Sequence, residues 1–159
     1  CVMVGAHVCA AWAAHDYERT EMIKEIVKDR DFLSKPAEPA TADDAEVVQD
    51  LRDTIEALDD CVCLAANQIG STKAIIAYED NGRTFVMLNP KIKIAAQPYQ
   101  AQESCLSLEE VSEVKRFQMI TVGYQVVANG NLVSRTKRLS GWTAEIVQHA
   151  IDHCAGKLV

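Results

Sequence analysis

The stretch "KAIIAYEDNGRTFVML", residues 73–88, carries two short runs of β-forming side chains on either side of the pair Asn81-Gly82. Two-residue hairpin turns need positive φ angles, which asparagine and glycine adopt more readily than other residues. The stretch therefore predicts two antiparallel strands, over residues 73–78 and 83–88, joined by a tight turn.

Three further β-type runs follow this hairpin and cover residues 91–96, 119–127 and 132–140. The pair Asn129-Gly130 separates the last two runs and predicts a second hairpin of the same kind. Because these turns leave no room for crossover helices, we expect the strands to be largely antiparallel.

A helix is predicted ahead of the strands, where a loop with prolines gives way to residues 41–58. Thr41 is placed to cap its start, and the charges of Asp43 and Asp44 suit the positive pole of the first turn. The apolar side chains recur on one face, which is the pattern of a helix packed on a core. These side chains are Val48, Leu51, Ile55 and Leu58.

A second helix is predicted at the end of the chain, over residues 143–154, and it carries two histidines. The order of helix, strands and helix, with hairpins as connections, predicts an α+β protein. We expect the antiparallel strands to pack around this C-terminal helix.

Composition limits the class of protein. The 159 residues suit one domain, and 48% hydrophobic with 25% charged residues is typical of a soluble globular protein. The net charge of −7 argues against a nucleic-acid binder, and no apolar run reaches the roughly 18 residues of a membrane span. The cysteines are not framed like a small disulfide scaffold, so we expect them to stay reduced in a cytoplasmic protein, with one or two serving chemistry. They are Cys1, Cys9, Cys61, Cys63, Cys105 and Cys154.

The first fourteen residues differ in composition from the rest, because they contain no Asp, Glu, Lys or Arg. A secretory signal would begin with basic residues, which this stretch lacks. We interpret residues 1–21 as an N-terminal extension that need not belong to the natural protein, and residues 22–159 as the domain.

The two histidines of the final helix, His149 and His153, stand four residues apart, so they share one face and can point to one ion. The position after the first histidine, where helical metallohydrolases place a glutamate, holds Ala150. A divalent ion needs a third protein ligand, and Cys105 in "QESCLSLEE" is the best candidate, because a thiolate with two imidazoles suits Zn²⁺ or Fe²⁺. From spacing alone, ordinary histidines and a small buried cysteine remain alternatives.

Three separate segments resemble, in the right order, the three signature motifs of peptide deformylases. "CVCLAANQIG" (61–70) resembles G-x-G-L-A-A-x-Q, "ESCLS" (103–107) resembles E-G-C-L-S, and "QHAIDH" (148–153) resembles Q-H-E-x-D-H. The resemblance covers residues 22–159 and is greatest to the short Gram-positive-type members. It implies a bacterial metal-dependent hydrolase of protein biosynthesis, which removes the formyl group from the initiator methionine of nascent polypeptides.

The resemblance also implies roles for individual residues. Cys105, His149 and His153 would hold one divalent ion, with Fe²⁺ the physiological choice and Zn²⁺ or Ni²⁺ as alternatives. The side-chain amide of Gln68 and the backbone N–H of Leu106 would donate hydrogen bonds to the oxyanion that grows on the formyl carbonyl.

Other side chains would shape the substrate pocket and support the ligands. Glu103 would pair with a basic residue, and Asp152 would help to orient the third motif, so that both support the metal ligands without binding the ion. Each of these residues also has a plain structural reading, as a core or surface side chain. The residues expected to line the pocket for the methionine side chain are Val62, Cys63, Trp142 and Ile146.

Departures from the motifs bear on activity. Ala150 stands where the family has the glutamate that acts as general acid and base, and a methyl group cannot move protons. Cys61 and Cys63 replace glycines of the first motif, the second of which lies close to substrate. An inactivating substitution made by design would leave the first motif untouched, so the three changes together favour natural divergence over engineering.

Several hypotheses for the function remain open. The leading one is a deformylase-type hydrolase that is weak or inactive in this form. A second is a metal-binding pseudoenzyme, or a module that binds formylated N-termini without cleavage, and a third is a purely structural metal site. An H-E-x-x-H metalloprotease is disfavoured, because Asp152 and the cysteine ligand fit deformylases better. The expected partners are N-formylmethionyl peptides, including nascent chains on the ribosome, and neither nucleic acid nor membrane.

Overall fold

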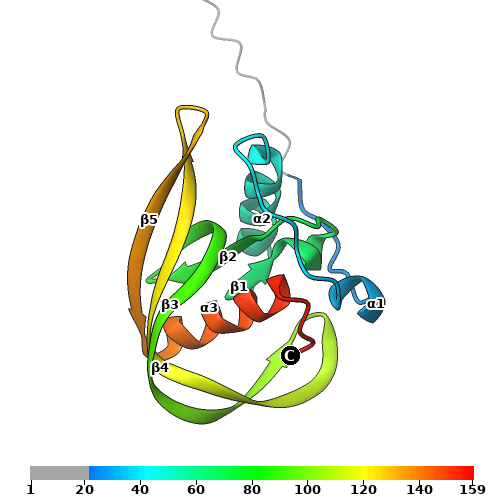
Figure 1. Cartoon of the computed structure of the whole chain (residues 1–159). Coiled ribbons are helices and arrows are strands. Elements are labelled where there is room, and N and C mark those ends of the chain that lie inside the picture. The colour runs from blue at the N-terminus through cyan, green and yellow to red at the C-terminus, as the bar shows by residue number, and fades with distance from the viewer. Residues whose placement is uncertain (1–21) are drawn as a thin grey trace, which may run out of the picture.

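One five-stranded sheet curves around the C-terminal helix in the computed structural model, which describes residues 22–159 (Figure 1). The predicted extension, residues 1–21, lies outside the described residues. The strands follow one another across the sheet in sequence order, and every neighbouring pair is antiparallel. The predicted α+β class is therefore confirmed. The strands are β1 (Cys63–Ala65), β2 (Ile75–Asp80), β3 (Arg83–Cys105), β4 (Leu108–Ala128) and β5 (Asn131–Ser140).

Both predicted hairpin turns are present. Asn81 and Gly82 have φ angles of 51° and 71°, and Asn129 and Gly130 have φ angles of 51° and 74°. Two consecutive residues with positive φ are the signature of the turn whose twist matches that of the flanking strands. These two turns fix the register of β2 against β3 and of β4 against β5.

The strand β3 is longer than predicted, because the runs 83–88 and 91–96 are one strand that continues to Cys105. Its second half pairs with the first half of β4, down to the pair Cys105 and Leu108. The inward positions of this long hairpin hold polar groups such as Glu103 and Arg116. A hydrophobic alternation is therefore missing there, and the sequence pattern does not reveal the strands.

The helices are α1 (Arg30–Leu33), α2 (Ala45–Ala57) and α3 (Gly141–Cys154), with the short 3₁₀ helix η1 (Ala66–Ile69). The expected capping role of Thr41 is wrong. Asp44 stands at the N-cap of α2, and the Thr41 backbone N–H donates to its carboxylate at 2.7 Å. The helix starts at Ala45, too far along the chain for the threonine hydroxyl to reach its first turn.

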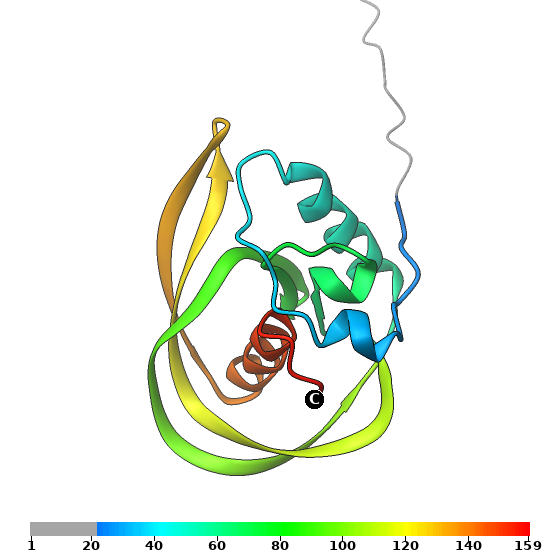
Figure 2. The ribbon, with the colours of Figure 1, turned by 45° about the vertical axis from the view of Figure 1, so that its right-hand side comes forward.

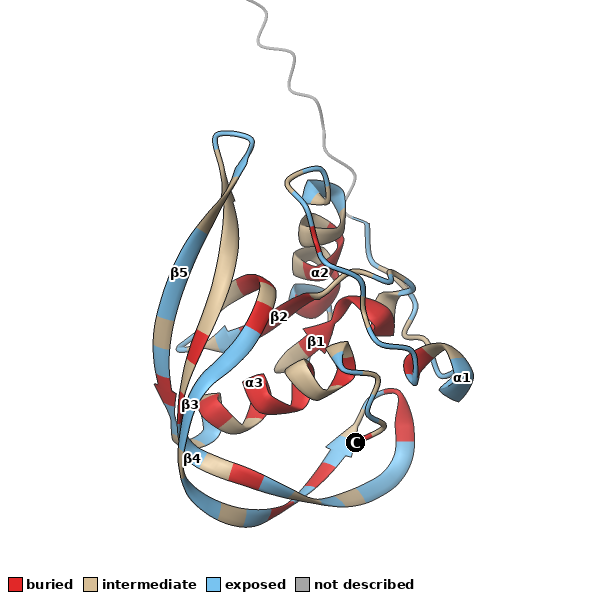
Figure 3. Cartoon of the chain, viewed as in Figure 1, coloured by how far each residue is buried: buried red, intermediate tan, exposed pale blue. Residues whose placement is uncertain are grey.

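Two apolar clusters hold the helices against the sheet, and Figure 3 shows the buried residues gathered along α3, β1 and β2. Leu51 and Ile55 of α2 are buried, and Val48 and Leu58 pack beside them, as the sequence predicts. The long strands β3 and β4 bend around α3 and enclose this helix on several sides (Figure 2). In residues 22–159, no helix is long and apolar enough to cross a membrane.

Candidate metal centre

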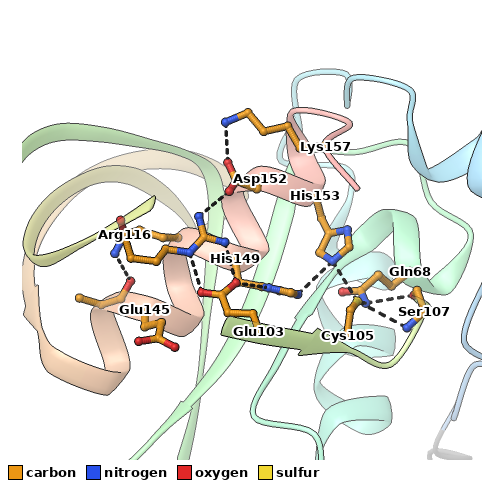
Figure 4. Close-up of polar contacts among 12 residues, drawn as sticks. Gln68, Glu103, Cys105, Ser107, Arg116, Glu145, His149, Asp152, His153 and Lys157 are labelled. Atoms are coloured by element: carbon orange, nitrogen blue, oxygen red, sulfur yellow. Dashed lines mark hydrogen bonds and ion pairs between the residues drawn. The ribbon is translucent and has the colours of Figure 1, made fainter. Parts of the chain in front are cut away.

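Three potential ligand atoms converge between the end of β3 and the helix α3 (Figure 4). The Nε2 atoms of His149 and His153 are 3.2 Å apart, and the Sγ atom of Cys105 lies 3.2 Å from His153 Nε2. The ligand atoms of these residues all lie within 4.8 Å of one another. Because one turn of helix separates the two histidines, both rings face the same point.

The surroundings hold these atoms in place. His149 Nδ1 lies 2.8 Å from Glu103 Oε2, so its Nε2 is left for the centre. The side-chain amide of Asn67 donates to the backbone carbonyl of His153 at 2.9 Å. The backbone N–H of Ser107 donates to Cys105 Sγ at 3.4 Å. One thiolate sulfur and two imidazole nitrogens are a donor set that suits a single Zn²⁺ or Fe²⁺ ion.

Behind the ligands lies a buried ion-pair network centred on Arg116 of β4. Its Nε and Nη2 atoms donate to the two carboxylate oxygens of Glu103 at 2.6 and 2.7 Å. Its Nη1 atom donates to Asp152 at 2.6 Å, and Lys157 donates to the other oxygen of Asp152 at 2.8 Å. The expected pairing of Glu103 with a basic residue is thus present, and the network joins the strand that carries Cys105 to α3.

The charges of the centre depend on one another. Burial raises the pKa of the Cys105 thiol, but the interactions with His149 and His153 outweigh this and lower the pKa to about 5. Burial lowers the pKa of His149, whereas its bonds with Cys105 and Glu103 raise the pKa to about 9. The lowered pKa of Cys105 favours the thiolate, which is the form of cysteine that binds a divalent cation.

A cavity of about 180 Å³ opens beside the centre, with Cys105 and His149 in its wall. Ile146 is almost fully buried, whereas Trp142 is 62% exposed, which is expected of a side chain at a rim. The four residues expected to line a pocket, Val62, Cys63, Trp142 and Ile146, all line this cavity, as do Gln68 and Leu106.

The side chain of Gln68, on η1, is oriented by two hydrogen bonds. Its Oε1 accepts from the backbone N–H of Ala65 at 2.9 Å, and its Nε2 donates to the Ser107 hydroxyl at 3.1 Å. The same Nε2 lies 3.5 Å from Cys105 Sγ. The amide N–H group of Gln68 thus points toward the candidate metal centre.

Ala150 is fully buried in the apolar cluster between α3 and the sheet. Cys63 packs against the same cluster, and burial, the largest cause, raises the pKa of its thiol far above the usual value. Cys63 is not part of the group that could hold an ion among the described residues. The cysteines that the structure describes, Cys61, Cys63, Cys105 and Cys154, are free thiols.

Sequence reasoning missed Arg116, Ser107 and Glu145. Ser107 was within the quoted "ESCLS" motif, where its hydroxyl could have been considered as a partner of Gln68. Arg116 follows the exposed Lys115 directly, and the register of β3 and β4 is needed to see that Arg116 alone of the two is buried. Glu145 lies one turn before His149, and this spacing places it on the helix face that looks into the cavity.

Comparisons with known proteins agree on one family. The model of the polypeptide deformylase family matches residues 23–159. A peptide deformylase of Clostridium beijerinckii is 41% identical over 139 residues, which cover 87% of this chain and 100% of the relative. One from Aquifex aeolicus is 32% identical and covers 85% of this chain and 84% of its own length.

Solved structures show the same likeness. A class I type b peptide deformylase from Acinetobacter baumannii has a TM-score of 0.76 at 26% identity, over 86% of this chain and 97% of its own. The peptide deformylase of Thermus thermophilus has a TM-score of 0.75 at 30% identity, over 86% of this chain and 84% of its own. With its ligand cluster, its fold and these relatives, the chain belongs to the peptide deformylase family.

Proposed function

We propose that this chain is a metallohydrolase that binds one divalent metal ion through Cys105, His149 and His153 and removes the N-formyl group from the initiator methionine of newly made polypeptides, with weak activity in this form. The observation that carries the proposal is the convergence of three ligand atoms, within 4.8 Å, at the wall of a cavity. We take residues 22–159 as the functional domain and residues 1–21 as an extension. Fe²⁺ is the physiological ion in this proposal, with Zn²⁺ and Ni²⁺ as substitutes, and the protein acts on nascent chains in the bacterial cytoplasm.

The neighbouring residues support binding of a formyl group. An ion held at this centre would supply Lewis-acid polarisation of a carbonyl. Gln68 presents its amide N–H beside Cys105, and it can donate to negative charge that develops on the formyl oxygen. Leu106 lines the same cavity and would add its backbone N–H to this role. The methionine side chain would lie against Val62 and Ile146, in the cavity that Cys63 and Trp142 also line.

Hydrolysis also requires a group that accepts a proton from water and passes it to the leaving amine, and Ala150 cannot do this. Glu103 is a poor substitute, because both of its oxygens are bound by Arg116 and one of them by His149. Despite burial, these bonds lower the pKa of Glu103 to about 2. We therefore propose that turnover by this chain is weak or absent.

A module that binds formylated N-termini without cleaving them is the second candidate function. It is favoured by the environment of Ala150, whose methyl group is fully buried in the apolar cluster against which Cys63 packs. Changes at Cys61 and Cys63, in addition to Ala150, support natural divergence of the site over a single engineered lesion.

Metal content and peptide binding together test the proposal. Elemental analysis of the purified chain should find close to one divalent transition metal per chain, and a Cys105→Ser variant should hold much less. The metal-loaded chain should bind formyl-Met-Ala-Ser more tightly than unformylated Met-Ala-Ser in a titration. A chain that takes up no zinc, iron or nickel, or that binds both peptides equally, contradicts the proposal.

A further inference from the structure

Two buried side-chain atoms, Oδ1 of Asn67 and Nδ1 of His153, have no hydrogen-bond partner within residues 22–159. No other buried side-chain nitrogen or oxygen atom of the described residues lacks a partner. His153 is completely buried, and Asn67 is 5% exposed. Because a buried polar group without a hydrogen bond destabilises a folded protein, this pair of atoms calls for an explanation.

The two residues are already in contact. Asn67 belongs to η1, and its Nδ2 atom donates to the backbone carbonyl of His153 at 2.9 Å and to that of Leu33 at 3.4 Å. These carbonyls fix which way the amide faces, because the reverse orientation would set its oxygen against two carbonyl oxygens. The unpartnered atom of Asn67 is therefore an acceptor, on a side chain that is bound to His153.

The unpartnered atom of His153 becomes a donor when the residue binds an ion. Its Nε2 atom lies 3.2 Å from Cys105 Sγ and 3.2 Å from His149 Nε2, so this nitrogen faces the centre. Figure 4 shows the other ring nitrogen on the far side of the ring. A neutral imidazole that gives its Nε2 lone pair to an ion carries its proton on Nδ1. One buried donor and one buried acceptor thus belong to neighbouring residues.

The other histidine ligand already has the corresponding partner. His149 Nδ1 lies 2.8 Å from a carboxylate oxygen of Glu103. Metal-binding histidines nearly always donate their second N–H to a carboxylate, a carbonyl or a water molecule, and that bond fixes the tautomer and the direction of the ring. His153 needs a group of this kind, and Asn67 offers an acceptor without a donor.

We propose that Asn67 is the positioning residue of His153. Its Nδ2 atom holds the backbone of the histidine, and its Oδ1 atom accepts from His153 Nδ1–H when an ion occupies the centre, in contact or through one enclosed water molecule. The inference rests on the proposed function, because it concerns a ligand of the proposed metal ion.

Two substitutions separate the two ends of the amide. Competition for Zn²⁺ with a coloured chelator measures the affinity of the full-length chain. Asn67→Leu removes both the donor and the acceptor, and we expect it to weaken zinc binding about 10- to 100-fold. Asn67→Asp removes the donor but keeps an acceptor for His153, so it should bind zinc about as tightly as the parent even though the chain is less stable.

A second asparagine serves as the control for a structural role. Asn89 Nδ2 donates to the carbonyl of Ala40 and to the side chain of Gln125, so it also joins separate segments of the chain. Asn89→Ala should lower the stability and leave the zinc affinity unchanged. In ¹⁵N NMR spectra of the zinc-loaded proteins, the His153 Nδ1–H signal should shift in Asn67→Leu and stay in place in Asn89→Ala.

The outcomes separate this inference from the proposed function. If Asn67→Leu binds zinc as tightly as the parent, or if Asn67→Asp binds it as weakly as Asn67→Leu, the positioning role is wrong and the proposed function stands. If Asn67→Leu does not fold, a crystal structure of the zinc-loaded parent decides. A link between Asn67 Oδ1 and His153 Nδ1 supports the role, and a different acceptor on Nδ1 overturns it. A parent chain that takes up no zinc overturns both proposals.

Discussion

Glu103 Oε2 lies 2.8 Å from His149 Nδ1, and this contact fixes which ring nitrogen of the histidine faces the candidate metal centre. We predict that Glu103→Gln weakens metal binding about 10- to 100-fold, the range found when a carboxylate behind a metal-binding histidine is lost. Competition for Zn²⁺ with a coloured chelator measures the effect. Glu113→Gln, which changes an exposed residue of β4, should leave the affinity for Zn²⁺ unchanged. Equal affinities of the parent and Glu103→Gln would show that Glu103 does not orient His149 for metal binding.

A buried charge network carries part of the stability. Arg116→Leu would leave Glu103 and Asp152 without their shared cation, and breaking a buried pair in this way costs about 3–5 kcal/mol. Urea denaturation of the metal-free proteins should show this loss in the free energy of unfolding. The neighbouring Lys115 is exposed, and Lys115→Leu should change that free energy by no more than about 0.5 kcal/mol. Similar losses for both variants would show that the network contributes little.

Restoring the missing carboxylate should restore turnover in two steps. We predict that Ala150→Glu raises the initial rate on formyl-Met-Ala-Ser, and that Cys63→Gly combined with Ala150→Glu raises it further. The second step follows because Cys63 packs against the buried cluster in which the new carboxylate must find room. Ala150→Gln, which has the same shape but cannot move protons, is the control. A glutamine variant as active as the glutamate variant would show that proton transfer is not what the site lacks.

The sequence predicted most of the fold through local signals. The pairs Asn81-Gly82 and Asn129-Gly130 marked both hairpins, and the spacing of His149 and His153 marked the helix that bears two of the ligands. The second half of β3 and the first half of β4 were not predicted, because their inward side chains serve the charge network instead of an apolar core. Local patterns cannot show such strands, since their alternation is not one of hydrophobicity.

The residues of the candidate site likewise fall into those that a local signal predicted and those that it did not. Cys105 and Gln68 were reached through short motifs, and they do converge with the histidines. Arg116 and Glu145 carry no motif, and their roles depend on the register of β4 and on the turn of α3 that faces the cavity. Such residues become visible only when separate segments are placed side by side.

We propose that this chain keeps the metal ligands of its family and lacks the group that moves protons. The most direct measurement is the initial rate at which the zinc-loaded chain hydrolyses formyl-Met-Ala-Ser, beside the Clostridium beijerinckii relative loaded in the same way. We predict a rate at least about a hundredfold below that of the relative, because a positioned acid/base contributes about 10²–10⁴ in rate. A rate equal to that of the relative would contradict the claim, since another residue would then supply the proton transfer.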